Sequence, residues 1–351
     1  MVSMAESDAD QPSDTMRERV GESRTKLWLL LDADRRVIAT IPLGLVFISL
    51  VVLGVLDPAP ISRALVSGDP LETVFQGFLT AIITGVTLVV TINQLVLSQE
   101  LGAVDDQRER MAGAMDFRED VETAIEAPIS PPEPSSFLRA IIDVTQTRAN
   151  ALEEAVSESR DEQFKERTED YVDSLTVNAE TVGNQLEDAQ FGTFDLLFAA
   201  LDYNYSWKIY EARRLRNEHE DAVTDETDDA FESLIEVLKF FGPAREHFKT
   251  LYFEWELINL SRAMLYSAVP ALVVVLSMML YVANPGSITG TTFGVENLVW
   301  VASAASTIAL IPFMLLLSFI LRIATVAKRT LSIGPFILRE SARTEDIAWD
   351  E

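Results

Sequence analysis

The sequence predicts an all-α integral membrane protein with four membrane-spanning helices and a large cytoplasmic helical domain inserted between the second and the third. Three observations predict this fold: four long windows without a charged residue, helix-period apolar stripes between the two pairs of windows, and no alternating strand pattern longer than a few residues. A spanning helix needs about 20 apolar residues at about 1.5 Å each to cross about 30 Å of hydrocarbon. All four windows are long enough.

The N-terminal region, residues 1–36, precedes the first window. Its first 14 residues are acidic and polar, which predicts disorder. Trp28 lies in a short apolar run that is typical of an interfacial anchor. The Arg35-Arg36 pair superficially resembles a twin-arginine signal. The apolar run after it exceeds the usual signal length of about 7–15 residues, so we predict a retained span rather than a cleaved signal.

The four spans are predicted at 37–56, 73–98, 263–283 and 298–321. The run Asn284-Pro285-Gly286 separates the last two. Arg and Lys residues gather before the first span, on both sides of the segment between the two hairpins, and after the fourth span. The positive-inside rule therefore predicts a multi-pass cell-membrane protein whose two termini and middle segment are cytoplasmic, including a C-terminal tail over 322–351.

The segment 99–262 is predicted to be an acidic cytoplasmic domain. It holds 38 acidic and 16 basic residues, which leaves a net charge of −22. Apolar residues from Leu101 to Ile125 keep a helical spacing, so the second span is expected to continue as a helix into this domain. Four prolines between Ala127 and Ser136 predict a stiff linker, after which Ser135 or Ser136 caps a new helix.

Heptad-like apolar stripes then favour a coiled-coil-like arrangement. Helices are predicted over 138–156, 172–189, 194–215 and 231–241. The first two form either one long helix or a hairpin broken near residues 157–160. Thr227 is the expected N-cap of the last helix, and Gly242-Pro243 its expected end.

The net charge of the whole chain is −27, and only six of its 28 basic residues are Lys. This balance is typical of a salt-adapted protein, in which molar salt screens self-repulsion; an acidic mesophilic protein is the alternative. The same charge argues against a nucleic-acid partner, because binding a phosphate backbone needs a basic surface.

The chemistry-bearing residues are few. The chain has no Cys and two His, His219 and His247, both expected to pack or to face solvent. It has no Gly-rich phosphate loop and no hydrolase or metalloprotease motif. We therefore expect no cofactor, no metal site and no enzyme activity. No Asp, Glu, Lys, Arg or His lies within the spans, which argues against a proton relay.

The second span carries the sharpest feature, seven hydrogen-bonding side chains on one helix face. This polar stripe consists of Gln76, Thr80, Thr84, Thr87, Thr91, Gln94 and Ser98. Two readings stay open. The stripe packs against another helix, as small polar residues commonly do, or it lines a pore in an oligomer. In a pore, Glu72 and Glu100 at the two mouths would bias the selection toward cations.

The sequence therefore predicts a membrane-embedded homo-oligomer that is an ion channel with its second span around the axis. The alternative is a non-conducting anchor or sensor whose cytoplasmic helices bind a protein partner. The order of spans and insertion resembles, in topology only, that of bestrophin-type anion channels and of flagellar-motor stators. This likeness of layout transfers no site residue.

Overall fold

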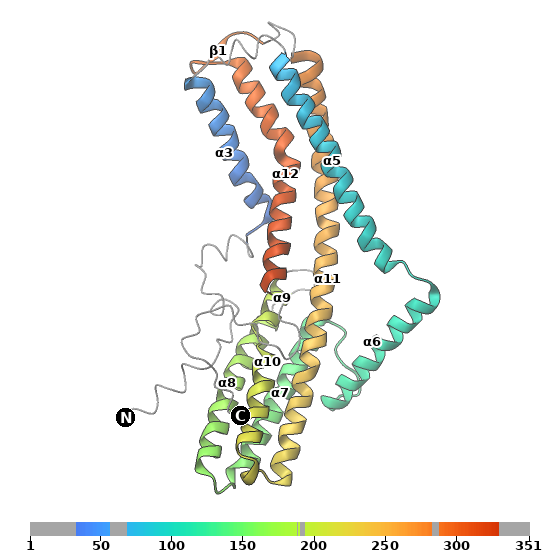
Figure 1. The fold of residues 1–351 in the computed structure, drawn as a ribbon, viewed down its shortest axis with the longest axis vertical. Helices are drawn as coiled ribbons and strands as arrows, with labels where there is room; N and C mark the ends of the chain where they lie inside the picture. Colours follow the sequence, from blue (N-terminus) through green and yellow to red (C-terminus); the bar gives the residue numbers. More distant parts are fainter. Residues whose placement is uncertain (1–32, 57–68, 188, 190–193, 283–287, 330–351) are drawn as a thin grey trace, which may run out of the picture. The chain divides into compact units, whose positions relative to one another are not determined.

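The computed structural model describes residues 33–56, 69–187, 189, 194–282 and 288–329, and these residues are nearly all helical (Figure 1). Four helices are long and apolar enough to cross a membrane, which indicates a multi-pass membrane protein. The chain divides into two compact units. The first contains residues 103–252, and the second contains residues 28–102 and 253–326.

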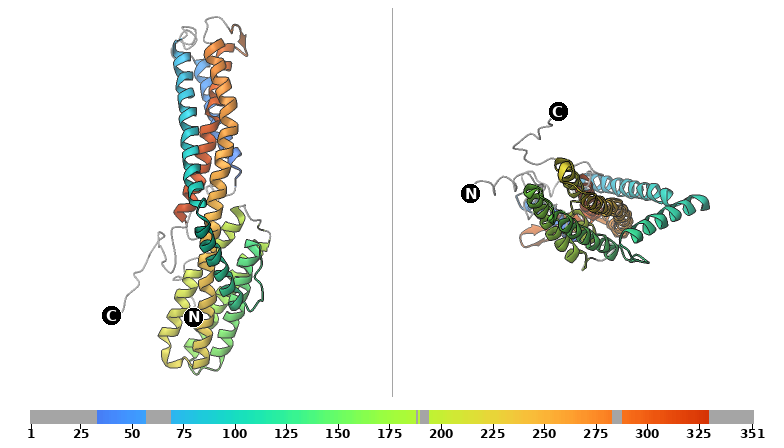
Figure 2. Two further views of the ribbon diagram at one scale, coloured as in Figure 1. Left: turned by 90° about the vertical axis from the view of Figure 1, so that its right-hand side faces the viewer. Right: turned by 90° about the horizontal axis from the view of Figure 1, so that it is seen from below.

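The second unit consists of the four apolar helices. They are α3 (Arg35–Leu56), α5 (Asp69–Glu100), the later part of α11 (Asp225–Ser277) with its π-helical extension η4 (Met278–Val282), and α12 (Asn297–Arg329). Both views in Figures 1 and 2 show these helices side by side. Each predicted span falls within one of them, apart from Ala283, which lies outside the described residues.

Small residues hold the second unit together. Ala271 of α11 and Ala309 of α12 are fully buried, and they share a cluster with Phe75 and Ile82 of α5. Short side chains let membrane helices approach closely, and this close approach strengthens the van der Waals attraction between them. The buried arc of α5 is therefore the arc that meets α11, η4 and α12.

A two-stranded hairpin lies just before α12, where the sequence predicted only a loop. Strands β1 (Thr291–Thr292) and β2 (Val295–Glu296) pair antiparallel. The two turn residues, Phe293 and Gly294, both have positive φ, as a tight type I′ turn requires. Asn297 ties this hairpin to α12 through hydrogen bonds with Thr289 and Thr292.

The first unit is a bundle of amphipathic helices. Its elements are α6 (Val104–Ala124), α7 (Pro134–Ser157), α8 (Glu162–Glu187), α9 (Phe194–Leu201), α10 (Tyr205–Glu218), the short η3 (Glu220–Ala222) and the earlier part of α11. Helices α7 and α8 pack against each other, so the stripes over 138–156 and 172–189 form a hairpin rather than one long helix. All the apolar stripe positions of these two helices are buried.

Two local predictions at the start of the first unit are wrong. The second span does not continue as an unbroken helix, because α5 ends at Glu100 and α6 begins at Val104. The carboxylate of Asp106 accepts a hydrogen bond from the N–H of Ala103 and so supports the new helix start. The N-cap of α7 is Glu133 rather than Ser135 or Ser136, with Pro134 in the first turn, where its missing N–H costs nothing.

Two further predictions differ from the structure later in the chain. The helix expected over 194–215 is two helices, and the carbonyl of Asp202 at the break accepts a hydrogen bond from the buried amide of Asn178. Gly242-Pro243 does not end a helix. Helix α11 runs through it, because the residues on both sides, Phe241 and Ala244, are buried in the core and packing offsets the bond that Pro243 cannot make.

Thr227 is not the N-cap of α11 either. The hydroxyl of Thr224 accepts a hydrogen bond from the N–H of Thr227, which makes Thr224 the capping residue. The predicted disorder of the first 14 residues, the Trp28 anchor and most of the C-terminal tail lie outside the described residues.

Candidate functional site

The polar stripe lies on the exposed face of α5. All seven of its side chains are exposed in the second unit, and so is Glu72 at the start of the helix. At about 100° of rotation per residue, the seven positions cover about 80° of the helix circumference. Among the described residues, the stripe is therefore not buried against another helix of the second unit.

The opposite face of α5 makes the contacts within the chain. Leu71, Phe75, Ile82 and Val89 are almost fully buried. Gly85 lies on the same side, where an added Cβ would be 3.4 Å from the ring of Phe313. Helix α5 is thus apolar and buried on one side, and polar and unburied on the other.

Exposed apolar residues flank the stripe on both of its edges. Ile83 and Leu97 lie on one edge, and Leu88 and Leu95 lie on the other. This pattern is typical of a helix whose apolar margins contact lipid or neighbouring helices, and whose polar stripe between them contacts water or polar side chains.

The stripe hydroxyls already have hydrogen-bond acceptors in their own helix. Thr80, Thr84 and Thr91 donate to the carbonyl oxygens four residues earlier at 3.1, 2.8 and 2.9 Å. Thr87 donates to Ile83 at 2.9 Å, and Ser98 to Leu95 at 2.7 Å. A hydroxyl bonded in this way keeps free lone pairs that water or an ion can approach.

The two amides of the stripe differ from its hydroxyls. Within the described part of the chain, neither Gln76 nor Gln94 makes a side-chain hydrogen bond. They are 18 residues apart, or about 27 Å along the helix axis. Glu100 ends α5, and its side chain lies outside the described residues.

A shallow groove of about 700 Å³ runs along one edge of the stripe. Its α5 wall includes Gln76, Thr80 and Thr84, and its α12 wall is Phe313 and Leu316. Thr73 also lines this groove and is in phase with the stripe. Sequence reasoning misses Thr73 because this residue begins the predicted span at 73–98, whereas the predicted stripe begins at Gln76.

A charged layer in the second unit was also missed. Arg35 of α3 forms an ion pair with Glu256 of α11, and its guanidinium lies 5.0 Å from the ring centroid of Phe319. Arg322 of α12 is buried and donates a hydrogen bond of 2.7 Å to the carbonyl of Ala33. Arg35 and Arg322 lie within two residues of an uncharged window and Glu256 lies seven residues before another, so counting charges within the windows could not reveal this layer.

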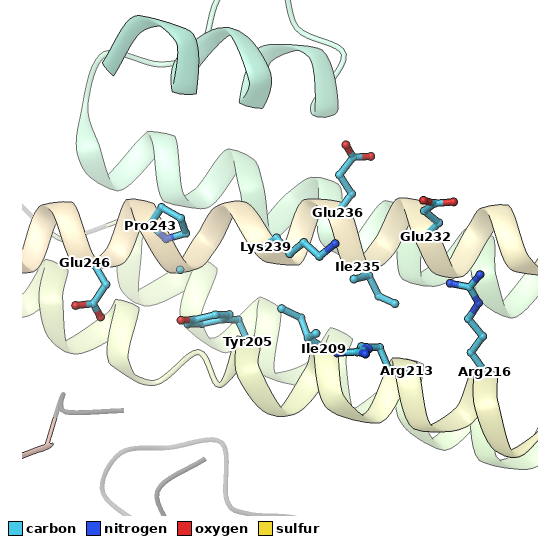
Figure 3. Close-up of a pocket in the computed structure, with 11 residues that line it drawn as sticks. Tyr205, Ile209, Arg213, Arg216, Glu232, Ile235, Glu236, Lys239, Pro243 and Glu246 are labelled. Atoms are coloured by element: carbon cyan, nitrogen blue, oxygen red, sulfur yellow. The ribbon is translucent and has the colours of Figure 1, made fainter. Parts of the chain in front are cut away.

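A second groove lies in the first unit, between α10 and α11 (Figure 3). Its volume is about 890 Å³, and its floor is formed by the buried side chains of Tyr205, Ile209 and Ile235. Figure 3 shows the basic side chains that line it, with Arg213 and Arg216 on α10 and Lys239 on α11. This groove is not predictable from the sequence, because it depends on how two helices meet.

Of the two histidines, His219 is a packing residue and His247 is exposed. His219 stacks on Phe164 at 4.9 Å, and its Nδ1 lies 3.1 Å from a carboxylate oxygen of Asp161. Hydrogen bonds from the N–H of Phe164 and from His219 hold the pKa of the Asp161 carboxyl below its usual value. His247 is exposed beside Phe248. Among the described ranges, no cluster of three or more His, Cys, Asp or Glu is arranged to hold a metal ion.

Comparison with known proteins gives one match. The model of a protein family described as "Family of unknown function (DUF7972)" matches residues 1–351. No curated protein and no solved structure matches the chain.

Proposed function

Because the chain belongs to the DUF7972 family, whose function is unknown, we propose from its own residues that it is the subunit of an oligomeric ion channel. In this channel the polar stripes of α5 from several copies line a shared axis. The single observation that carries the proposal is the exposure of all seven stripe residues in their own chain.

The position of the stripe supports an oligomer. Membrane proteins usually place small polar residues where helices meet, because hydrogen bonds and close approach favour contact there. Among the described residues they lie on the exposed face of α5, while Phe75 and Ile82 on the opposite face supply the buried contacts within the unit. A contact between copies is the arrangement that restores the usual placement.

The width of the stripe supports a pore rather than a simple dimer contact. The stripe covers about 80° of the helix circumference. This width fits a helix that belongs to a ring of helices and faces the central axis with one side only. The apolar margins, with Ile83 on one side and Leu95 on the other, then contact neighbouring subunits. Hydroxyls and amides would let ions pass without strong binding, and Glu72 at one mouth would favour cations.

The rest of the proposal follows from the charge distribution in the sequence. We place the first unit and both termini in the cytoplasm of a salt-adapted cell, with four helices per copy in the cell membrane. The proposal assigns no catalytic role to the chain.

The test uses the absence of Cys from the chain, so each introduced thiol is the only one. Thr84→Cys and Thr91→Cys should react with a membrane-impermeant, water-soluble thiol reagent in reconstituted vesicles and should change the ion flux. Val90→Cys is the matched control, since Val90 is next to Thr91 and exposed but lies off the stripe. Ile82→Cys is the buried control.

The outcome separates the two readings. A rate at least about tenfold higher at the two stripe positions than at Val90, together with flux that the reagent alters, supports the channel. Equal low reactivity at all four positions, with no flux from the purified protein, overturns it.

The alternative is a non-conducting anchor, and one observation favours it. Every stripe hydroxyl already donates to its own backbone, as Thr84 does to Thr80, so the threonines can face lipid without an unmade hydrogen bond. In that case α5 would contact lipid or another membrane protein, and the first unit would bind a cytoplasmic partner. The same cysteine series decides between the two.

A further inference from the structure

The groove between α10 and α11 combines an apolar floor with positive charge. Tyr205, Ile209 and Ile235 are more than nine-tenths buried, and they form its base. Three basic and three acidic side chains line it, in a chain that carries 55 acidic and 28 basic residues. A gathering of three basic side chains beside an apolar floor is unusual in so acidic a chain and fits an acidic ligand with an apolar anchor.

Two of the three carboxylates around this groove do not neutralise it. Figure 3 shows the carboxyl group of Glu236 on the side of α11 that faces away from the gap between the two helices. Glu246 is already paired with Arg245 and Lys249. Glu236 and Glu246 are therefore not the partners of the basic side chains in the gap.

Two of the three basic side chains remain available. Arg216 is held by Asp228 in a bidentate pair of 2.5 and 2.6 Å. For Arg213 and Lys239, which are both exposed, no ion pair exists within the described ranges. The groove thus presents two unneutralised positive charges beside an apolar floor.

We propose that this groove binds an acidic segment of the same chain, residues 345–351. The segment reads Glu-Asp-Ile-Ala-Trp-Asp-Glu, with four acidic residues and no basic one. Its two large apolar side chains, Ile347 and Trp349, are two residues apart, so an extended chain directs both to the same side. These two side chains would pack on the apolar floor of the groove, and the carboxylates of the segment would pair with Arg213 and Lys239.

The length of the groove matches the length of the extended segment. From Glu232 to Glu246 the groove follows 14 residues of α11, or about 21 Å. Seven residues of extended chain cover about 23 Å. The 16 steps from Arg329, where α12 ends, to Glu345 can reach about 50 Å. The contact requires the first unit and the C-terminal tail to be on the same side of the membrane, as the basic residues predict. It does not depend on whether α5 conducts ions.

Disulfide cross-linking in the full-length chain tests the proposal. One variant carries Arg213→Cys and Ala348→Cys, and the control carries Glu236→Cys and Ala348→Cys. Glu236 is also exposed and lines the same groove, but its side chain points away from the gap. Because both pairs are tethered by the same tail, a difference between them reports docking rather than tether length. We expect at least about tenfold faster cross-linking of the Arg213 pair, within one chain.

Two substitutions in the Arg213 variant test the contacts. Trp349→Ala removes the apolar anchor and should slow cross-linking by more than about tenfold. Lys239→Glu should slow the cross-linking about threefold, which is the effect expected from the loss of one exposed ion pair. Asp346→Lys in the same chain should restore the cross-linking rate.

Four results would overturn the proposal. Equal rates for the two cysteine pairs would show that the tail does not dock. Insensitivity to both Trp349→Ala and Lys239→Glu would exclude the stated contacts. Cross-links only between chains would make a second copy the occupant. Loss of the cross-link in vesicles rich in anionic phospholipid, but not in neutral ones, would assign the groove to a lipid headgroup.

Discussion

Replacing Gly242 with Ala should destabilise the first unit, although Ala is the better helix former. A Cβ at this position in α11 would lie 2.9 Å from the Tyr205 hydroxyl oxygen and 3.0 Å from its Cε2 and Cζ. The Tyr205 ring cannot move aside freely. Phe241 lies 5.9 Å away, centroid to centroid, and the guanidinium of Arg245 lies 4.9 Å from the ring centroid.

The expected magnitude is a difference of two terms. Overpacking a filled site costs about 1–3 kcal/mol, and Gly to Ala in a helix gains about 1 kcal/mol. The net free energy of unfolding should fall by about 1 kcal/mol, which lowers the Tm by about 2–4 °C for a unit of this size. The measurement is thermal unfolding of the full-length chain, followed by circular dichroism in detergent and salt.

Gly183 of α8 provides the matched control. It is also a buried helical glycine, but an added Cβ there would meet no atom within 4 Å. Gly183→Ala should therefore raise the Tm, because only the helix-propensity gain remains. If both substitutions raise the Tm equally, the close approach of Tyr205 to α11 does not limit stability, and the reasoning is refuted.

Three further predictions concern pH, salt and topology. Because the carboxyl pKa of Asp161 is lowered in the folded chain, its hydrogen bonds with the N–H of Phe164 and with His219 stabilise the fold above the ordinary aspartate pKa of about 3.9, and this stabilisation is lost as the pH falls through the lower folded value. Asp161→Asn should flatten the acid side of the stability profile, and an unchanged profile would contradict this. Lowering salt from molar to about 0.1 M, where the Debye length is about 10 Å, should lower the Tm or dissociate the oligomer, and an unchanged melting curve would remove the salt-adaptation argument. In intact cells, Ser67→Cys and Ser287→Cys should label from outside, whereas labelling of Ser157→Cys without lysis would reverse the topology.

The helices were predictable where apolar periodicity is strong. In α7 and α8 every stripe position, from Leu138 to Leu186, is buried, because a period near 3.6 leaves one face for the core. Local breakers were less reliable. Gly242-Pro243 predicts a helix end by its backbone chemistry, yet the burial of Phe241 and Ala244 keeps the helix continuous.

The candidate site was predictable only in part, for a different reason. The spacing of the stripe was visible in the sequence, but whether it contacts its own chain depends on which arc of α5 meets α11 and α12. That choice follows from residues such as Phe75 and Gly85, whose partners in α11 and α12 are more than 170 residues away. The charged groove of α10 and α11 likewise needs Arg213 and Lys239 to be brought together by the fold.

The distribution of polar groups along α5 determines which experiment can separate pore from anchor. Gln76 and Gln94 are about 27 Å apart, close to the hydrocarbon thickness of about 30 Å, so both amides can reach the two membrane interfaces even if α5 faces lipid. The threonines between them satisfy their hydroxyls within the helix. The cost of burying polar groups therefore does not by itself require water at this face. Thr84 and Thr91 lie between the amides, at depths that water does not reach in a lipid-facing helix. Reactivity of thiols at these two positions therefore tests directly for a water-filled axis.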